Sequence, residues 1–502
     1  MHHVNLIHNI PFFSIFLAMF CGIITPLCNK GRTARRIHGV MVLTVGIMSA
    51  ILLASVTKNQ ESFTFMMGHF PAPWGNELRA GPMEALMALV FSIVMFLTIT
   101  GGSGFIYNEI VPDKQNLYFI MLNAAFGAML ALIYTNDMFT AYVFIEILTI
   151  ASCALIMAQG TAQSIVGTTH YLVISLLGSG LFLLGLCILY SITGHLLMPQ
   201  MKEAIYVLAV TGKYHFPLLV VSGFMFIGIA IKSALFPFHS ALPGAYGSTL
   251  STSGGILSGL VLKSYIILGI KMIYSVFSID IMHHLKIVDI FFVFGLMGMI
   301  FGSLFAVKET RMKRMLAYSS VAQIGYIFMG IGMGSNIGMT AACFHILAHA
   351  FTKTMLFICC GEFVDDNGGK EQIYHMKGLA LRNPLAGIGF TVGALSMVGV
   401  PLTAGFVSKM YFASASLYSP GKIIAVMIVL AISMILNAMY FLPSVIAIWT
   451  PKKGVKKEEY QKIVLSPTFS IAVVLFIAAH LVLGIGYQPI IHIIEMGISL
   501  LQ

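Results

Sequence analysis

Apolar runs long enough to cross a membrane recur along almost the whole chain, and they constrain its fold more than any other feature. The hydrocarbon core of a bilayer is about 30 Å thick, so a spanning helix needs about 20 mostly apolar residues. Inside that core every backbone N–H and C=O must be satisfied within the protein, which leaves only helices and closed β-barrels. Runs of this length predict helices, so we expect an all-α polytopic membrane protein.

Composition agrees with one helical bundle. Of the 502 residues, 58% are hydrophobic and 9% are charged, with a mean hydropathy of +0.92. These values exclude an ordinary soluble domain, and the even spread of the runs favours one bundle over several domains. Residues 488–502 form a further apolar tail suited to the membrane interface. The runs predict about 14 spans, at residues 10–28, 37–57, 82–103, 115–134, 138–158, 165–191, 216–236 continuing with a break to 248, 250–271, 287–306, 315–334, 337–360, 384–418 with a break, 422–449 and 467–487.

Basic residues are unevenly shared between the loops on the two sides. Lys and Arg are enriched in cytoplasmic loops, which explains the net charge of +10 without nucleic-acid binding. The bias predicts a multi-pass protein of the cell inner (plasma) membrane with both termini on the non-cytoplasmic side. The cytoplasmic set is Lys30, Arg32, Arg35, Arg36, Lys114, Lys308, Arg311, Lys313, Arg314, Lys370, Lys377, Arg382, Lys452, Lys453, Lys456, Lys457 and Lys462, and the smaller opposite set is Lys58, Arg79, Lys202, Lys213, Lys271, Lys286 and Lys422.

Two of the predicted spans are interrupted. In IKSALFPFHSALPGAY, residues 231–246, prolines break the run that contains Lys232, and in SMVGVPLTAGFVSKMYF, residues 396–412, glycines and a proline precede Lys409. A broken helix at membrane depth is tolerated where its freed backbone groups meet protein or water.

The two interruptions lie five spans apart, so spans 4–8 and 9–13 run in opposite directions. This arrangement is typical of an inverted repeat with a discontinuous helix in each half. We therefore divide the chain into helices 1–3 (1–114), two inverted five-helix repeats (115–271 and 287–449), and a basic cytoplasmic loop with helix 14 and the tail (450–502).

Lysines inside the predicted spans are expensive to bury. An ammonium near the bilayer centre costs at least ~3 kcal/mol, so it normally faces the protein interior or a water-filled cavity. These lysines are Lys232, Lys263, Lys353 and Lys409. For Lys263 or Lys409 taken alone, a side chain that reaches to the membrane interface is the alternative.

Glu146 lies in the fifth span with no other charge in its run. It is either a protonated acid in a helix interface or the partner of Lys232. At ~6 Å and an effective dielectric of ~20, the attraction between the two charges is ~2.8 kcal/mol. Burial lowers a lysine pKa whereas a nearby carboxylate raises it, so moving the glutamate would switch the protonation of the lysine.

Histidines join a lysine on one face of the eleventh span. In FHILAHAFTKTMLF, His345, His349 and Lys353 stand at i, i+4 and i+8. Two zinc ligands are one interpretation, but no HExxH glutamate or Cys/Asp set accompanies them. A proton relay suits neutral imidazole, and a structural role is the alternative to both.

Weaker candidates lie at span ends. His239 and His170 can simply be hydrated there, and Ser319 and Ser320 either bind water in a proton wire or pack helices as small residues. The seven cysteines show no cluster-binding spacing, so we expect no iron–sulfur, haem or other cofactor and no metal.

These motifs resemble one family over nearly the whole chain. FIEILTIASCALI, IKSALFPFHSALPGAY, GLVLKSY, RMKRMLAYSSVAQIGYI, FHILAHAFTKTMLF and GVPLTAGFVSKMYF follow in the order of antiporter-like proton-channel subunits. Such subunits occur in respiratory complex I, membrane-bound energy-converting hydrogenases and Mrp-type cation/proton antiporters. The resemblance implies a proton path through Glu146, Lys232, Lys263, His345 and Lys409, to which His239, His349, Lys353, Ser319 and Ser320 add supporting polar groups.

Details of the resemblance indicate which members of the family this chain resembles most. Lysine at position 409 is similar to the Mrp D-type and the complex I N-type proteins, and FPAPWGNEL, residues 70–78, resembles Mrp D-type and hydrogenase subunits. Two departures concern the seventh-helix break, where Ala241 replaces a usual tryptophan and GAYGSTLSTSGG lacks a usual proline. The resemblance therefore does not fix the local geometry of that break, although its lysine is retained.

The resulting expectation is a proton-translocating subunit without catalytic chemistry of its own, possessing no cofactor and working inside a multisubunit complex. The expected partners are homologous antiporter-like subunits, small membrane subunits, the lipid bilayer, protons, and Na⁺ through the complex, with no nucleic acid. A stand-alone secondary solute transporter would instead present half-helix ends at a midplane pocket. A quinone-interacting subunit of a dehydrogenase is a further alternative, although no cofactor fingerprint supports it.

Overall fold

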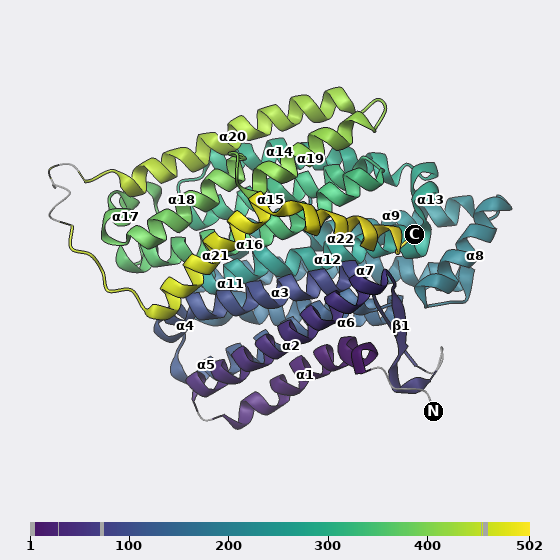
Figure 1. Ribbon diagram of the computed structural model, residues 1–502, viewed down its shortest axis with the longest axis horizontal. Coiled ribbons are helices and arrows are strands. Elements are labelled where there is room, and N and C mark those ends of the chain that lie inside the picture. The colour runs from purple at the N-terminus through teal and green to yellow at the C-terminus, as the bar shows by residue number, and fades with distance from the viewer. Residues whose placement is uncertain (1–5, 29, 71–74, 453, 455–459) are drawn as a thin grey trace.

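Helices make up almost all of the described chain (Figure 1). The structure, a computed structural model, describes residues 6–28, 30–70, 75–452, 454 and 460–502. In these residues thirteen helices are long and apolar enough to cross a membrane. The predicted twelfth span supplies the fourteenth crossing as two shorter helices, so the all-α membrane fold is confirmed. Lys453, Lys456, Lys457 and residues 71–74 of the FPAPWGNEL segment lie outside the described residues.

The fourteen predicted spans correspond to the following helices: α1 (Ile10–Ile24), α2 (Gly31–Asn59), α3 (Pro82–Gly101), α5 (Pro112–Tyr134), α6 (Met138–Ile156), α7 (Ala162–Thr193), α9 (His215–Lys232) with α10 (Ala241–Gly247), α11 (Ser251–Ile256) continuing through η5 (Leu257–Val261), α12 (Leu262–Met272) and η6 (Ile273–Phe277), α14 (Ile287–Lys308), α15 (Met312–Gly332), α16 (Asn336–Asp366), α18 (Pro384–Val398) with α19 (Ala404–Leu417), α20 (Ile423–Trp449) and α21 (Pro467–Ile485). Two of these pieces, η5 and η6, are π-helical. The eighth span therefore extends six residues beyond its predicted end at residue 271.

Shorter elements connect the spans. The helices among them are α4 (Ser103–Glu109), α8 (Met198–Val210), α13 (Ile279–His284), α17 (Leu379–Arg382) and α22 (Tyr487–Ser499), with 3₁₀ turns η1 (Leu6–Asn9), η2 (Thr25–Leu27), η3 (Met67–His69), η4 (Met157–Gln159) and η7 (Ile373–Met376). An antiparallel hairpin pairs β1 (Phe63–Met66) with β2 (Glu77–Ala80), so that Phe63 faces Ala80 and Met66 faces Glu77. The sequence pattern predicted neither this hairpin nor α8.

Both predicted interruptions are present. α9 ends at Lys232, and a turn containing the cis Phe236–Pro237 peptide separates it from α10. α18 ends where Gly399 takes φ +96°, and Thr403 caps the start of α19. The departures at Ala241 and downstream therefore leave the seventh-helix break in place. The division into two inverted repeats stays a prediction.

The bundle has an inner and an outer layer of helices. The segment 251–277 and α16 are 100% buried over their apolar windows, and α15 is 94% buried, whereas α2, α7, α20 and α21 are only 33–39% buried. Because lipid is itself apolar, the outer faces of those helices need no protein cover. The polar candidates should therefore be sought on the three inner segments.

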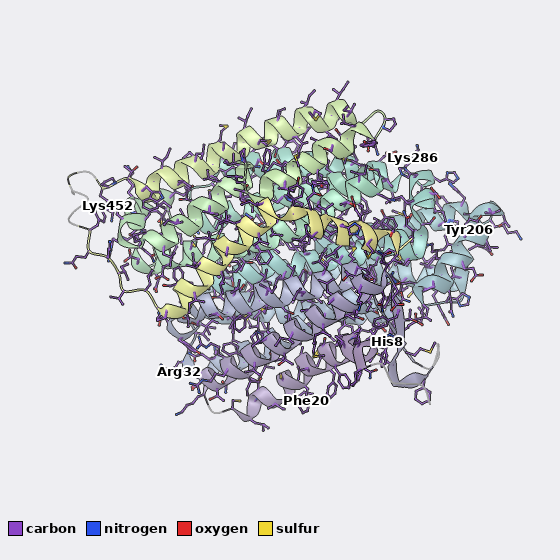
Figure 2. The ribbon with its side chains drawn as sticks, viewed as in Figure 1. His8, Phe20, Arg32, Tyr206, Lys286 and Lys452 are labelled. Atoms are coloured by element: carbon purple, nitrogen blue, oxygen red, sulfur yellow. The ribbon has the colours of Figure 1, made fainter. Side chains whose placement is uncertain are left out.

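The two ends of the bundle carry different elements. Figure 2 shows Arg32 and Lys452 at one end and Tyr206 and Lys286 at the other, where the hairpin also lies. His8 stacks on Phe63 of the hairpin at 4.2 Å between ring centroids, and Lys202 of α8 donates to the carbonyl of Gln502. Both ends of the described chain therefore lie at the same end of the bundle.

The apolar tail packs on the bundle instead of lying apart from it at the interface. α22 contacts α3 and α16, and a Cβ on Gly497 would come within 2.6 Å of the Cβ of Met83. Figure 1 shows α22 continuing from α21 toward the end of the bundle that carries β1.

Glycines set the closest contact between neighbouring spans, α14 against α15. A Cβ on Gly325 would lie 2.6 Å from the backbone nitrogen of Met299. A Cβ on Gly295 would likewise overlap the backbone nitrogen of Met329. Small residues allow backbones to approach this closely in membrane bundles. Even one methyl group would therefore force α14 and α15 apart.

We expect Gly325→Ala to destabilise the protein by ~1–3 kcal/mol, because overpacking moves two backbones that side-chain rotation cannot relieve. The measurement is the unfolding midpoint in detergent, read from the reaction of a fluorogenic maleimide with buried thiols such as Cys343. The control is Gly180→Ala on α7, where a new Cβ meets no atom within 4 Å. Equal midpoints for the two variants would contradict the packing argument.

Candidate functional site

The four predicted intramembrane lysines are all buried. Their exposed fractions are 3% for Lys232, 0% for Lys263 and Lys353, and 5% for Lys409. None of them forms an ion pair with a carboxylate within 4.0 Å in the described part of the chain. Each instead donates to a neutral oxygen of a carbonyl or hydroxyl group. The site is therefore a set of buried amines with uncharged acceptors.

Lys232 is joined to the helix of Glu146 through a hydroxyl. It is the last residue of α9, and its Nζ donates to Thr149 Oγ1 of α6 at 2.6 Å. Its ammonium also lies 5.9 Å from the ring centroid of Tyr265. Glu146 is half-buried one turn before Thr149 on α6, so the two share a helix face. The amine of Lys232 thus contacts the same face of α6 that carries Glu146.

Three inner segments are connected by hydrogen bonds around Lys263. Its Nζ donates to the carbonyl of Ser258 in the π-helical segment η5, and Ser258 Oγ is hydrogen-bonded to Ser320 Oγ of α15 at 2.8 Å. Ser320 Oγ in turn donates to the carbonyl of Leu316 at 3.0 Å. The chain of contacts thus crosses from the eighth to the tenth span.

The carbonyl of Leu316 also connects these residues to the eleventh span. Lys353 Nζ of α16 donates to Leu316 O at 2.7 Å and to Ser319 Oγ. The structure therefore brings together Lys263, Lys353, Ser319 and Ser320, which sequence spacing alone could not place side by side. Ser319 contacts Lys353 directly, whereas Ser320 is connected to Lys263 through Ser258.

A second cluster surrounds Lys409. Its Nζ donates to Met397 O at the end of α18 (2.8 Å) and lies 5.4 Å from the ring centroid of Tyr326. The neighbouring Ser408 Oγ is hydrogen-bonded to His345 Nδ1 at 2.9 Å. His345 and His349 stack with ring centroids 6.0 Å apart, as expected for i and i+4 on one face. The cluster thus joins α16 to the broken helix.

Gly399 shapes the pocket that receives Lys409. Its φ of +96° is a conformation that side chains with a Cβ rarely adopt, and a Cβ there would lie 2.8 Å from Lys409 Cδ and 3.2 Å from Nζ. The residue that ends α18 therefore also makes room for the amine of α19.

Several buried polar atoms of α15 and α16 have no hydrogen-bond partner among the described residues. Gln323 is fully buried with both amide atoms unpartnered, and the same holds for both ring nitrogens of His349 and for Nε2 of His345. Buried polar groups are normally satisfied by protein or by ordered water. These side chains are thus suited to contact water molecules between Lys263 and Lys409.

His239 is placed differently from the other predicted residues. Its ring stacks on Phe236 at 5.1 Å and on Phe305 at 5.7 Å, and its Nδ1 has no hydrogen-bond partner in the described chain. No contact joins it to the lysine clusters there. His170 lines a cleft near α10 at the end of the bundle that carries Arg314.

Sequence reasoning missed a fifth buried lysine, Lys271. We assigned it to a loop, but η6 extends the span past it, and it is 1% exposed. Its Nζ donates to the carbonyls of Ile133 (2.9 Å) and Thr135 at the end of α5. A cation is favourable at a helix C-terminus. The only available signal was its spacing of eight residues from Lys263 within one apolar run.

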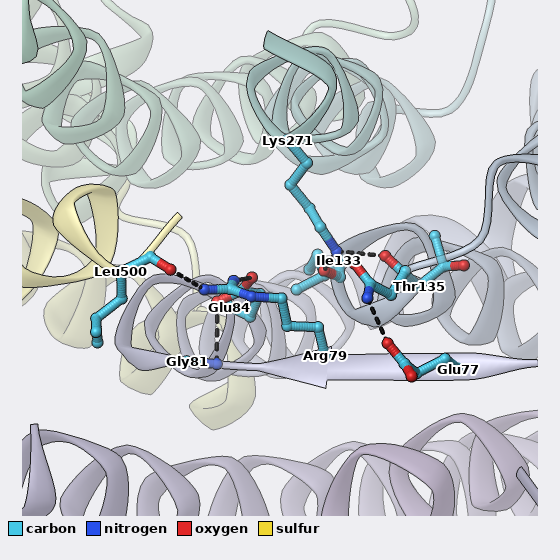
Figure 3. A network of polar contacts seen from close by, with 9 residues as sticks. Glu77, Arg79, Gly81, Glu84, Ile133, Thr135, Lys271 and Leu500 are labelled. Atoms are coloured by element: carbon cyan, nitrogen blue, oxygen red, sulfur yellow. Dashed lines mark hydrogen bonds and ion pairs between the residues drawn. The ribbon is translucent and has the colours of Figure 1, made fainter. Parts of the chain in front are cut away.

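A buried ion pair lies beside Lys271 (Figure 3). Arg79 of β2 pairs with Glu84 in the first turn of α3, although the sequence pattern placed Arg79 in a loop. Glu84 also accepts from the N–H of Gly81 at 3.0 Å, and Arg79 donates to Leu500 O near the C-terminus. The hairpin, α3 and the tail are thereby connected at one end of the bundle.

Metal-binding groups do not gather in the described chain. No group of three His, Cys, Asp or Glu side chains converges among its residues, and all seven cysteines are free. The residues that do gather are amines, imidazoles, hydroxyls and amides. Such groups exchange and relay protons through hydrogen bonds and water.

Comparison with known proteins agrees with this chemistry. The family model "NADH:quinone oxidoreductase/Mrp antiporter, TM" matches residues 135–436. The N subunit of the NADH-quinone oxidoreductase of Desulforudis audaxviator is 30% identical over 409 residues, covering 80% of this chain and 78% of that protein. The D subunit of the Na(+)/H(+) antiporter of Alkalihalophilus pseudofirmus is 26% identical over 490 residues, covering 96% of this chain and 95% of that protein.

Solved structures show the same fold. A chain of the Mrp complex from Dietzia sp. superposes with a TM-score of 0.88 at 20% identity, covering 99% of this chain and 98% of that one. A chain of the archaeal membrane-bound sulfane sulfur reductase gives 0.87 at 24% identity, with 99% and 97% covered. With the family match over more than half of its length, this chain belongs to the NADH:quinone oxidoreductase/Mrp antiporter transmembrane family.

Proposed function

We propose that the chain is the proton-translocating, antiporter-like subunit of a multisubunit membrane complex. The observation that carries the proposal is the hydrogen-bonded connection from Lys263 through Ser258, Ser320 and Leu316 to Lys353, inside the three most buried segments. Intramembrane ionisable residues typically mark ion paths and proton relays.

The residues divide into an entry, a central and a terminal group. Lys232 takes up protons under the influence of Glu146, and Lys263 with Lys353 forms the centre. His345 relays protons toward Lys409, with His349, Gln323 and bound water between the clusters. Lys409 exchanges protons with the outside because it follows the interruption of the twelfth span, where unwound backbone can admit water.

The parent complex is a cation/proton antiporter of the Mrp type or a complex I-like or hydrogenase-like enzyme. The relatives from an antiporter and from an oxidoreductase support both, and both are named as subunits, which favours a complex over a stand-alone solute carrier. Homologous antiporter-like subunits and small membrane subunits would surround the chain, and Na⁺ would pass through the complex. We place it in the inner (plasma) membrane with both termini outside the cytoplasm.

The first prediction concerns Glu146 and Lys232, which act on one protonation step. In membrane vesicles, Glu146→Gln and Lys232→Ala should each reduce proton transport by the intact complex at least tenfold, because each removes one half of the switch. The double variant should lose much less than the product of the two losses, since coupled residues are non-additive. Lys213→Ala in an exposed loop is the control, and multiplicative losses would show independent roles.

The second prediction concerns Lys409 as a group that must change protonation state. Lys409→Met and Lys409→Arg should both abolish coupled transport, since methionine has no exchangeable proton and guanidinium stays protonated at accessible pH. Lys409→Glu should retain some transport, because a buried carboxyl also exchanges protons. Transport is measured in vesicles, and blue-native electrophoresis confirms assembly. Near-normal transport in the assembled arginine variant would make Lys409 a fixed structural charge.

A further inference from the structure

Three arginines crowd the first turns of α2. Arg32, Arg35 and Arg36 stand at i, i+3 and i+4, so they share one helix face, and like charges at this spacing repel. They also lie at the N-terminus of the helix, the positive end of its dipole. Figure 2 shows Arg32 at this end of the bundle. Both effects favour an anion beside the arginines.

No carboxylate neutralises this cluster in the described chain. None of the three arginines forms an ion pair within 4.0 Å there. Arg35 lies over the ring of Tyr107 at 5.7 Å, and Asp113 lines the neighbouring cleft with Arg32 without reaching ion-pair distance. The positive charge is therefore available to a bound molecule.

A cleft of about 270 Å³ leads from these charges along the apolar side of α2. Gly39 and Leu43 follow Arg35 at i+4 and i+8, so charge gives way to apolar surface along one helix face. A Cβ on Gly39 would meet no atom within 4 Å, which leaves the groove open. Phe96 of α3 also lines the cleft.

A buried polar side chain lines the same cleft. His38 is 0% exposed, and its Nδ1 donates to Asn123 Oδ1 at 2.6 Å, whereas its Nε2 has no hydrogen-bond partner. It follows Arg35 by about one turn, deeper in the membrane. The cleft thus offers cations at its mouth, an unsatisfied imidazole nitrogen next, and apolar walls beyond. Cations followed by apolar walls match a phospholipid from phosphate to acyl chain, and Nε2, which is an acceptor while Nδ1 donates, can accept a hydrogen bond from a lipid hydroxyl.

We propose that this cleft binds an anionic phospholipid. The phosphate lies between Arg35 and Arg36, and one acyl chain follows Gly39 and Leu43 toward Phe96. Charge complementarity selects this occupant, because a zwitterionic lipid leaves the arginine charge uncompensated and a free anion leaves the apolar groove unused. Basic pockets beside transmembrane helices are typical sites for such headgroups. The proposal is independent of the proton path, because none of the residues proposed for that path lines this cleft.

The test is a titration of the purified full chain in detergent, followed by native mass spectrometry. Dioleoyl phosphatidylglycerol is compared with dioleoyl phosphatidylcholine, and inorganic phosphate is added as a competitor. Wild type should prefer phosphatidylglycerol at least tenfold, and phosphate at millimolar concentration should not displace it. The double variant Arg35→Gln/Arg36→Gln should bind ~30-fold more weakly, since each arginine near anionic lipid contributes about fivefold.

Two further variants distinguish binding in the groove from general electrostatic attraction of anionic lipid. Gly39→Leu keeps every arginine but fills the groove, so it should also lose the preference, whereas Lys58→Gln at the other end of α2 should keep it. Unfolding midpoints confirm that all variants are folded. Equal binding of the two lipids by wild type, displacement by phosphate alone, or an unchanged preference in the double or Gly39→Leu variant would each overturn the proposal.

Discussion

The structure depends on how it accommodates amines in its interior without carboxylate partners. Lys263, Lys409 and Lys271 all donate to backbone carbonyls at places where a helix departs from regular α geometry: a π-helical segment, the end of α18 and the end of α5. Such irregularities free carbonyls that a continuous α-helix would use itself. Lys353 and Lys232 are exceptions. Leu316 lies in regular α15 and shares its carbonyl with two serine hydroxyls, and Lys232 donates to the hydroxyl of Thr149 in α6. The broken and π-helical segments and the end of α5 therefore supply the acceptors for three of these five buried lysines.

Much of the fold could be predicted from sequence, because a helix that crosses a membrane needs a long apolar run. Run length placed the spans within a few residues, and proline and glycine revealed both breaks. The burial of Lys271 was not predicted, because hydropathy alone defined the end of the span. In the structure a π-helical segment extends that helix by six residues. The contacts from Lys263 to Lys353 could not be predicted for another reason. The sequence pattern shows which face of its own helix a residue occupies, but not which helix packs against that face. The hydrogen bond from Lys232 to Thr149 was not predicted for the same reason.

The layers of the bundle separate two kinds of chemistry. The contacts from Lys263 to Lys353 occupy the segment 251–277, α15 and α16, which lie away from lipid, whereas Lys232 and Lys409 extend from α9 and α19. The outer helices are apolar on their free faces, and their charge is concentrated at their ends, as in the arginines of α2. The inner layer therefore keeps polar contacts away from the surface, whereas the outer layer presents mainly apolar faces. The close glycine contacts between α14 and α15 bring an outer helix tightly against this inner layer.

In the described chain no carboxylate lies within 4.0 Å of Lys232, Lys263, Lys353 or Lys409, and this also affects how protons would move. A carboxylate in contact with a buried lysine would stabilise the ammonium so strongly that its proton could hardly leave. A carbonyl or hydroxyl acceptor is different, because a neutral amine and an ammonium can both donate to it. The same hydrogen bond therefore survives either protonation state, and the surrounding helices need not rearrange. Glu146 is the informative case, since it shares a face with Thr149 yet makes no ion pair with Lys232 within 4.0 Å. A carboxylate that stays out of ion-pair contact leaves the ammonium able to release its proton, which is the condition that reversible transfer requires.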